Sequence, residues 1–580
     1  MYIIGINAYH ADSSACILKN GELIAAVEEE RFTRIKHFAG FPKNSIQYCL
    51  DICNIKLSDV KYVAINRDPK ANNLKRVLYL LSQRPSIKLI FNRFRNRLKY
   101  QNFKDILIKE FKNDRFQGEL INIEHHFAHL SSCFHVSPFK KACLISVDGF
   151  GDFASSAWGY GDNNEIFIDK KIFFPHSLGI FYQSMTQFLG FKNYGDEYKI
   201  MGLAPYGEPK YLELLKKILV IKSNGEFQLN LNFFKFHKSD FKYTWDSGVL
   251  EVGDLYSKNL EKLFGPARKK NQPILQFHKD LAHSVQNIYE EALINILKNL
   301  YDKYKCKNLC ISGGCGMNSV ANGKIKEYTN FKNIYVQPAA GDAGGAIGAA
   351  YSTYYKFEKK PKKFEMKHAY WGNNYDDNYI KNIIEKNISS NDSIYKKIFF
   401  EDKTNLCKLV AKFIAEKKVV GWFQGKMEWG PRALGNRSII ADPRSAEMKD
   451  ILNLKIKRRE SFRPFAPSIL IEEVKNWFEI EDKVPFMMKV YKIKKNKQKL
   501  IPAVTHVDGS GRLQTVEKDT NDIYYNLILE FKKITNIPIV LNTSFNENEP
   551  IVRSPEEALN CFLRTKMDVL VLGNSVVIRN

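Results

Sequence analysis

One local pattern occurs twice in this sequence: an apolar strand, a short polar turn and a second strand. The first copy begins with the apolar run Tyr2 to Ile6 and resumes as a strand from Ala15 to Lys19. The second copy covers Lys141 to Trp158, where the apolar segment ACLISV leads into the turn DGFGD. This repetition predicts two duplicated halves of one α/β fold, because the same unit of strands and turn is used again.

A glycine-rich turn follows a third apolar strand, Asn308 to Ser312, in the segment SGGCGMN. Gly313 and Gly314 allow the backbone to lie against adenosine or phosphate, and a helix starting near Asn318 favours anions. Together with the repeat, this turn predicts an actin-like ATPase fold. Ser13, in the first polar turn, would then face the nucleotide.

The segment EHHFAH, residues 124–129, contains two histidines at helical spacing. If the segment is a helix, His125 and His129 project from one face and can hold a single metal ion. Asp148 and Asp342 could supply two oxygen ligands, and this mixed set suits iron(II), zinc or manganese. His126 is an alternative ligand, although the spacing favours His125. The alternative to a metal site is a histidine pair that makes ordinary hydrogen bonds.

The length of 580 residues exceeds what one hydrophobic core organises, so two large domains are expected. An aromatic and lysine-rich stretch places a linker at residues 356–368, between domains at 1–355 and 369–580. The sequence contains no apolar run of membrane-spanning length and no recognisable signal peptide, which predicts a soluble cytoplasmic protein. Its ten cysteines, mostly in apolar segments, are expected to be reduced thiols.

A formal charge of +25 attracts anions without identifying them. Arg432 and Arg437 occur around Gly430 and Gly435 in a turn that cannot be regular helix, so both guanidinium groups can converge on one anion. A solvated basic helix is the alternative for the nearby run 455–459. A phosphate-handling enzyme accounts for the charge better than nucleic-acid binding does.

Eight motifs occur in order along the chain: HADSSA, EEERFTRIKH, EHHFAH, VDGFGD, SGGCGMN, GPRALGNRS, RPFAPS and LNTSFN. This set resembles the NodU/CmcH carbamoyltransferases essentially from end to end. The resemblance implies a duplicated actin-like (ASKHA) N-terminal domain, similar to tRNA threonylcarbamoyl transferases and the C-terminal part of HypF. It also implies a C-terminal YrdC-like α/β domain.

The resemblance implies an ATP-dependent O-carbamoyltransferase. The C-terminal domain would form carbamoyl adenylate from carbamoyl phosphate and ATP, and the N-terminal domain would transfer the carbamoyl group to a hydroxyl of a small molecule or glycan. Divalent iron is the metal that the family implies, and Mg2+ is a candidate companion of ATP. The residues carried over for binding carbamoyl phosphate or the adenylate are Arg432, Arg437, Lys457, Arg512 and Ser544. The implied metal ligands are His125, His129, Asp148 and Asp342, with His10 and Lys36 beside the transfer site and His10 as the base.

Two other functions stay open at the sequence level. One is a threonylcarbamoyl-type transferase that uses its positive charge to hold tRNA, and the other is a non-catalytic actin-fold ATPase that releases ADP. We expect a hydroxyl acceptor rather than a nucleic-acid partner, and a homodimer stays open because the sequence does not identify the oligomeric state. The acceptor itself is not identified by the sequence, because its specificity is expected in the insertions near residues 68–117 and 208–275.

Overall fold

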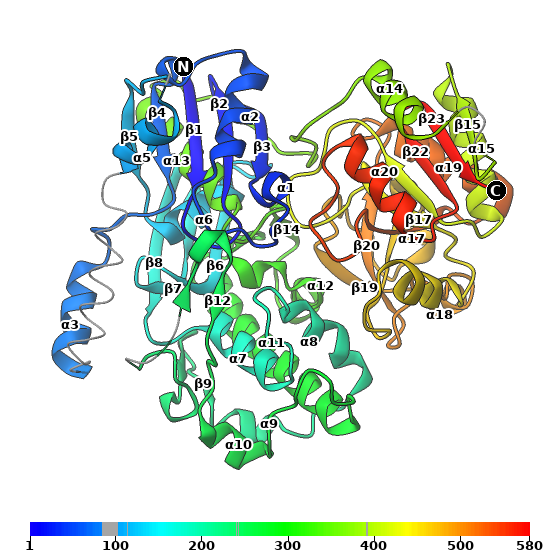
Figure 1. The fold of residues 1–580 in the computed structure, drawn as a ribbon. Helices are drawn as coiled ribbons and strands as arrows, with labels where there is room; N and C mark the ends of the chain where they lie inside the picture. The colour runs from blue at the N-terminus through cyan, green and yellow to red at the C-terminus, as the bar shows by residue number, and fades with distance from the viewer. Residues whose placement is uncertain (84–102, 113, 239–240, 242, 390–392) are drawn as a thin grey trace. The chain divides into compact units, whose positions relative to one another are not determined.

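The first half of the chain forms two five-stranded sheets with the same topology (Figure 1). In each sheet the first three strands are antiparallel neighbours, and the two later strands run parallel to the first. The first sheet contains β1 (Tyr2–Asn7), β2 (Ser14–Lys19), β3 (Glu22–Glu28), β4 (Tyr62–Ile65) and β5 (Glu119–Asn122). The second contains β6 (Lys141–Gly151), β7 (Ala154–Asp162), β8 (Glu165–Phe173), β13 (Asn308–Ser312) and β14 (Asn333–Val336). The predicted duplication is therefore confirmed.

These observations come from a computed structural model that describes residues 1–580 except 84–102, 113, 239–240, 242 and 390–392. The described chain divides into two units. The first comprises Met1–Asn318 and Ile325–Met366, and the second comprises Ser319–Lys324 and Lys367–Asn580. Parts of the two predicted insertions, 84–102 and 113 in one and 239–240 and 242 in the other, lie outside the described residues.

Helices α6 (His125–Phe134) and α13 (Gly344–Phe357) pack closely against each other in the first unit. A Cβ atom on Gly348 would lie 1.8 Å from the Ala128 carbonyl oxygen, so this contact requires glycine. Ser131 of α6 donates its hydroxyl to the Gly348 carbonyl at 2.8 Å. Helix α13 extends to Phe357, so its last residues lie within the predicted linker.

The other helices of the first unit are α1 (Glu30–Thr33), α2 (Lys43–Cys53), α3 (Asn73–Gln83), α5 (Phe103–Glu110), α7 (Leu178–Phe188), α8 (Glu197–Leu203), α9 (Leu212–Leu215), α10 (Lys258–Phe264) and α11 (Gln276–Tyr304). Helix α12 (Ser319–Tyr328) has residues in both units. Two further short hairpins pair β9 (Leu219–Ile221) with β10 (Phe227–Leu229), and β11 (Tyr243–Thr244) with β12 (Glu251–Val252).

The second unit is built on one mixed nine-stranded sheet, in the order β15-β23-β22-β16-β17-β21-β18-β20-β19. Its strands are β15 (Tyr395–Phe399), β16 (Val420–Phe423), β17 (Arg437–Ala441), β18 (Ala466–Leu470), β19 (Lys489–Lys492), β20 (Ser510–Val516), β21 (Ile539–Ser544), β22 (Val569–Leu572) and β23 (Ser575–Arg579). The helices are α14 (Asp377–Asn387), α15 (Lys403–Ala415), α16 (Met448–Asp450), α17 (Val474–Trp477), α18 (Lys495–Gln498), α19 (Asp522–Thr535) and α20 (Pro555–Arg564). The predicted α/β fold class is confirmed.

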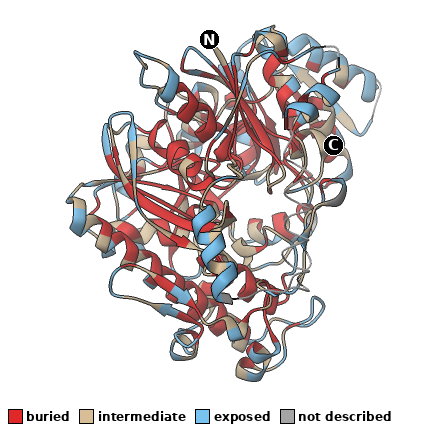
Figure 2. Cartoon of the chain, turned by 90° about the vertical axis from the view of Figure 1, so that its left-hand side faces the viewer, coloured by how far each residue is buried: buried red, intermediate tan, exposed pale blue. Residues whose placement is uncertain are grey.

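Buried apolar strands form the core of each unit, whereas several helices carry exposed surface (Figure 2). In the second unit Trp422, Val540 and Leu570 are fully buried in the sheet. Among the described residues, no helix combines the length and the apolar character that crossing a membrane requires.

Candidate metal centre and anion site

Helix α6 places the predicted histidine pair on one face. Its first turn is capped by Glu124, whose carboxylate accepts a hydrogen bond from the Phe127 N–H at 2.8 Å. His125 and His129 are one helical turn apart, and their Nε2 atoms lie 3.0 Å from each other. His126 points elsewhere, because its Nδ1 lies 2.9 Å from the Ser146 hydroxyl.

Two aspartates complete the group around these histidines. Asp148 lies in β6 beyond its apolar run, and Asp342 lies just before α13. The Nε2 atom of His129 is 2.8 Å from an oxygen of Asp148 and 3.4 Å from one of Asp342. The corresponding distances from His125 are 3.4 and 3.6 Å. All four side chains therefore offer a donor atom to one point.

The spacing of these donors fits one metal ion. Nitrogen and oxygen ligands at about 2.1 Å from an ion stand about 3.0 to 3.4 Å apart in octahedral or tetrahedral geometry. The donor-to-donor distances from 2.8 to 3.6 Å span that range. Two imidazoles and two carboxylates suit iron(II), zinc or manganese alike.

Electrostatics of the cluster favour a cation. Burial alone would raise the pKa of Asp148, but hydrogen bonds with His125 and His129 hold that pKa well below its usual range. Burial and the neighbouring charge of Asp148 raise the pKa of Asp342 to about 6. Burial opposes protonation of His129, yet its bonds to both aspartates raise its pKa to about 10. Positive charge at this point, from a proton or a metal ion, is therefore stabilised.

His10 lies beside the cluster, with its ring centroid 5.1 Å from that of His125. Burial, followed by the positive charge that His125 can carry, holds the pKa of His10 well below its usual range. A neutral imidazole in this position can accept a proton. Lys36, the other residue predicted to flank the site, is exposed in the loop after α1.

A histidine–carboxylate pair near Lys36 was not predicted. His37 Nδ1 lies 2.8 Å from Asp12, and the His37 N–H donates to Glu30 at 2.9 Å. Burial lowers the pKa of His37, but Asp12 outweighs this effect and the pKa is raised to about 9. A Cβ atom on Gly195 would lie 2.2 Å from the His37 ring, so this imidazole packs against the loop before α8. The polar and aromatic character of EEERFTRIKH was the available signal, but it does not reveal the partner.

The glycine turn predicted to bind nucleotide lies against the metal cluster. Gly313 adopts φ 84°, and a Cβ atom there would lie 2.2 Å from the Val147 carbonyl oxygen. A Cβ atom on Gly314 would lie 3.0 Å from the Asp148 carboxylate. This close approach brings the turn after β13 to the end of β6.

The two other candidate nucleotide residues hold loops together. The Ser13 hydroxyl donates to the Gly40 carbonyl at 2.8 Å. The side-chain amide of Asn318 pairs with that of Gln286, with distances of 3.0 and 3.1 Å. Both contacts use polar groups that were expected to face a nucleotide.

In the second unit, Glu428 organises the loop that contains the GPRALGNR motif. Its buried carboxylate accepts hydrogen bonds from the N–H groups of Leu434, Asn436 and Arg437 at 2.8, 2.9 and 3.1 Å. Gly435 adopts φ 106°, and a Cβ atom there would lie 2.2 Å from the Tyr524 ring. The loop therefore depends on one carboxylate that sequence reasoning did not identify.

Arg437 does not meet the expectation that it converges with Arg432 on an anion. Its guanidinium is fully buried and donates to the carbonyls of residues 373, 424, 425 and 436. It also lies 3.6 Å from the centroid of the Phe423 ring. Through these contacts Arg437 stabilises the conformation of the loop.

Arg512 is the centre of a different arginine group. It lies in β20, and its neighbouring charges are those of Arg432, Arg459 and Arg463. Burial and these three cations hold the pKa of Arg512 well below its usual range. Its Nε atom is buried without a hydrogen-bond partner, and among the described residues no carboxylate pairs with its guanidinium. We refer to Arg512, Arg432, Arg459 and Arg463 as the arginine group.

Two further groups in this unit bear on the predicted anion site. Burial lowers the pKa of His506 to about 4, with Arg512 among its neighbouring cations. The Lys457 ammonium is buried at the end of β21 and donates to the Ser544 carbonyl. It also donates to the side-chain oxygen of Asn546, at 2.7 Å. Lys457 and Ser544 are thus brought together as a pair.

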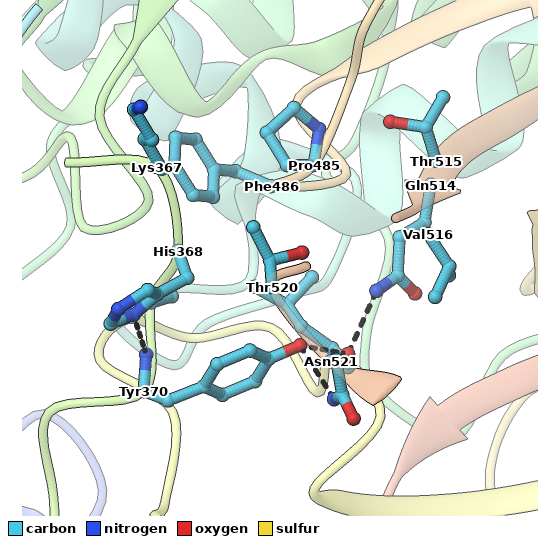
Figure 3. A pocket seen from close by; sticks show the side chains of 12 residues that line it. Lys367, His368, Tyr370, Pro485, Phe486, Gln514, Thr515, Val516, Thr520 and Asn521 are labelled. Carbon is cyan, nitrogen blue, oxygen red and sulfur yellow. Dashed lines mark hydrogen bonds between the residues drawn. The ribbon is translucent and has the colours of Figure 1, made fainter. Parts of the chain in front are cut away.

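A pocket of the second unit is lined in part by Leu434 of the GPRALGNR loop (Figure 3). There the Tyr370 hydroxyl donates to the Leu434 carbonyl and accepts from Asn521, each at 2.9 Å, and Gln514 donates to the same carbonyl at 2.8 Å. The residues lining it are Lys367, His368, Ala369, Tyr370, Leu434, Pro485, Phe486, Gln514, Thr515, Val516, Thr520 and Asn521. Of these described lining residues, none was predicted to bind carbamoyl phosphate.

Comparisons with known proteins cover nearly the whole chain. Residues 2–351 match the family model described as Carbamoyltransferase N-terminus, and residues 411–579 match Carbamoyltransferase C-terminus. The chain is 39% identical to an uncharacterized protein of Synechocystis sp., over 99% of this chain and 96% of that protein. It is 36% identical to nodulation protein NolNO of Sinorhizobium fredii, over 98% of this chain and 79% of that protein.

One solved structure, HypF of T. kodakarensis, is similar with a TM-score of 0.30 and 13% sequence identity. The match covers 62% of this chain and 48% of the HypF chain, so this chain spans about half of that protein. A structural similarity this low shows nothing about the activity of this chain.

Proposed function

Because this chain belongs to the carbamoyltransferase family, we propose that it is an ATP-dependent O-carbamoyltransferase with two reaction sites. The arginine group of the second unit would bind carbamoyl phosphate and ATP and form carbamoyl adenylate. The His10 and metal-cluster region of the first unit would transfer the carbamoyl group to a hydroxyl. The acceptor proposed is a small molecule or a glycan.

The arginine group is the observation that supports the adenylation step. The positive charges of Arg432, Arg459 and Arg463 repel the buried Arg512 guanidinium, and this arrangement is costly unless an anion offsets it. Carbamoyl phosphate and ATP each bring phosphate groups that guanidinium groups bind in paired hydrogen bonds. Lys457 and Ser544 are proposed to border the same substrates.

Atom balance sets the order of the first step. Carbamoyl adenylate keeps the carbonyl and one oxygen of carbamate, so the phosphoryl group of carbamoyl phosphate must leave first as inorganic phosphate, by attack of water. A carbamate oxygen then attacks the α-phosphorus of ATP, and pyrophosphate departs with the electron pair of the broken P–O bond. Positive charge around Arg512 stabilises both departing anions.

Transfer requires a base and a polarised carbonyl. Neutral His10 would remove the proton of the acceptor hydroxyl, whose oxygen attacks the carbamoyl carbon while the bond to AMP breaks. His125, His129, Asp148 and Asp342 would hold a divalent ion, and such an ion supplies Lewis-acid polarisation when bound. The products are the carbamoylated acceptor and AMP. A side chain at position 314 would crowd this site, because a Cβ atom there would lie 3.0 Å from the Asp148 carboxylate.

Phosphorus NMR of the reaction products tests this proposal. The purified protein is incubated with ATP, carbamoyl phosphate, ferrous ion, magnesium and a panel of hydroxyl acceptors, and each substrate is omitted in turn. We expect AMP and pyrophosphate only when ATP and carbamoyl phosphate are both present, together with inorganic phosphate from carbamoyl phosphate. Release of ADP without any need for carbamoyl phosphate would instead identify an ATPase.

A further inference from the structure

Helix α3 in the first unit is attached to the protein by one of its faces. The Tyr79 ring lies 5.8 and 5.1 Å from the rings of Phe153 and Phe174, with edge-to-face geometry. On the same side, the Lys75 ammonium lies 5.4 Å from the Phe173 ring. This aromatic face fixes which way the rest of the helix points.

The opposite face of α3 is apolar and exposed. Leu74, Val77, Leu78 and Leu81 follow helical spacing and are 72%, 51%, 48% and 69% exposed. At 100° per residue these four positions lie on the side of the helix away from Lys75 and Tyr79. Figures 1 and 2 show α3 standing out from the first unit, with most of its surface exposed. We refer to these four residues as the apolar stripe.

The sequence around α3 is basic and contains no acid. Between Asp68 and Asp105 there is no Asp or Glu. The basic residues of this stretch of sequence are Lys70, Lys75, Arg76, Arg84, Lys88, Arg93, Arg95, Arg97, Lys99 and Lys104, of which those from 84 to 99 lie outside the described residues. Apolar residues on one helix face combined with dense positive charge are typical of helices that lie in the surface of an anionic membrane.

We propose that the apolar stripe of α3 docks on an anionic phospholipid surface. The leucine and valine side chains would enter the boundary between headgroups and acyl chains, while lysines and arginines of the same stretch of sequence attract the negative headgroups. The proposed surface consists of residues of α3 alone. Docking of this kind needs no membrane-spanning helix.

Charge decides between this partner and two others. A second copy of the chain would bring two acid-free basic segments together, and their repulsion would oppose the contact. A nucleic acid would satisfy the positive charge but would leave the apolar stripe exposed, because phosphates and sugars offer leucine little to pack against. A lipid surface satisfies both features.

Vesicle co-sedimentation of the full chain tests the proposal. One set of vesicles contains phosphatidylcholine alone, and the other contains phosphatidylcholine with phosphatidylglycerol. The test variant is L74Q/V77Q/L78Q/L81Q, in which glutamine preserves helix propensity at exposed positions. The matched control is I52Q/V220Q/I394Q/I534Q, which removes four apolar side chains that are 46%, 46%, 55% and 52% exposed elsewhere. Circular dichroism and thermal unfolding establish that each variant is folded.

We expect the natural chain and the control to bind the vesicles containing phosphatidylglycerol and to bind phosphatidylcholine vesicles weakly. The α3 variant should bind the anionic vesicles at least about tenfold more weakly, because it retains only the electrostatic attraction. Three results would overturn the proposal: no binding of the natural chain, equal binding of the α3 variant, or a stripe-dependent dimer in analytical ultracentrifugation. Stripe-dependent binding of tRNA, without binding to vesicles, would identify a nucleic acid instead.

Discussion

The Nε2 atom of His129 lies 2.8 Å from the carboxylate of Asp148, although the two residues belong to different halves of the duplicated domain. His129 is on α6, which follows the first sheet, and Asp148 is at the end of the apolar run of β6, in the second sheet. The candidate metal centre is therefore a product of the duplication, because neither half contains all four ligands.

Metal content should depend on this contact. We expect H129N and D148N to purify with less than about a tenth of the natural chain's divalent metal, since each removes a ligand from a four-donor set. The matched control is H126N, which changes a neighbouring buried histidine of the same helix. It should keep its metal, because His126 faces Ser146. Elemental analysis of the purified proteins measures the metal content. Loss of metal from H126N, with metal retained by H129N and D148N, would show that His126 binds the ion and that our ligand set is wrong.

Arg512 should govern adenylate formation. Replacing it with alanine removes the guanidinium that the other three arginines surround, and we expect pyrophosphate release to fall about 100-fold to 1,000-fold. Arg444 provides the control, because its guanidinium already pairs with Asp442 at 2.8 Å. R444A should release pyrophosphate at nearly the natural rate. Similar losses in both variants would indicate that general charge, rather than this group, drives the step.

Glu428 should stabilise the loop beneath the arginine group. In E428Q the three backbone N–H groups lose a charged acceptor that is buried, and such a loss costs about 1 to 3 kcal/mol. We expect the thermal unfolding transition of the second unit to move down by several degrees in calorimetry. An unchanged transition would show that these hydrogen bonds are replaced without cost.

Stability should respond to pH through His37. Its pKa is raised to about 9 in the folded protein from an ordinary value of 6.5, because Asp12 outweighs the effect of burial. The pair therefore stabilises the folded state fully below pH 6.5, and this contribution is lost as the pH rises through 9. The thermal midpoint of the natural chain should fall more than that of H37Q over this interval. Parallel curves for the two proteins would contradict the assignment.

Local patterns in the sequence were sufficient to predict part of this architecture. The repeated strand and turn predicted two similar halves, and the four-residue spacing of His125 and His129 predicted a shared helix face. Both depend on periodicity, which short stretches of sequence carry directly. The convergence of Asp148 and Asp342 on that face was predicted with the help of the family resemblance.

Contacts between distant residues were harder to predict. Arg437 was expected at an anion, but its donors are used by backbone carbonyls of the surrounding loop. Sequence spacing shows that an arginine is near a turn, but not whether it points into the turn or out of it. Glu428 was not singled out, and the pairing of Asp12 with His37 was not predicted. Both contacts depend on which N–H or imidazole the fold brings to the carboxylate.

We propose that adenylate formation and carbamoyl transfer use different groups of the same chain. Carbamoyl-phosphate-dependent exchange of radiolabelled pyrophosphate into ATP measures the first step without requiring the acceptor to be known. We predict exchange in the natural chain and in H129N, and none above background in R512A. Exchange that persists in R512A, or disappears in H129N while the protein stays folded, would contradict the account.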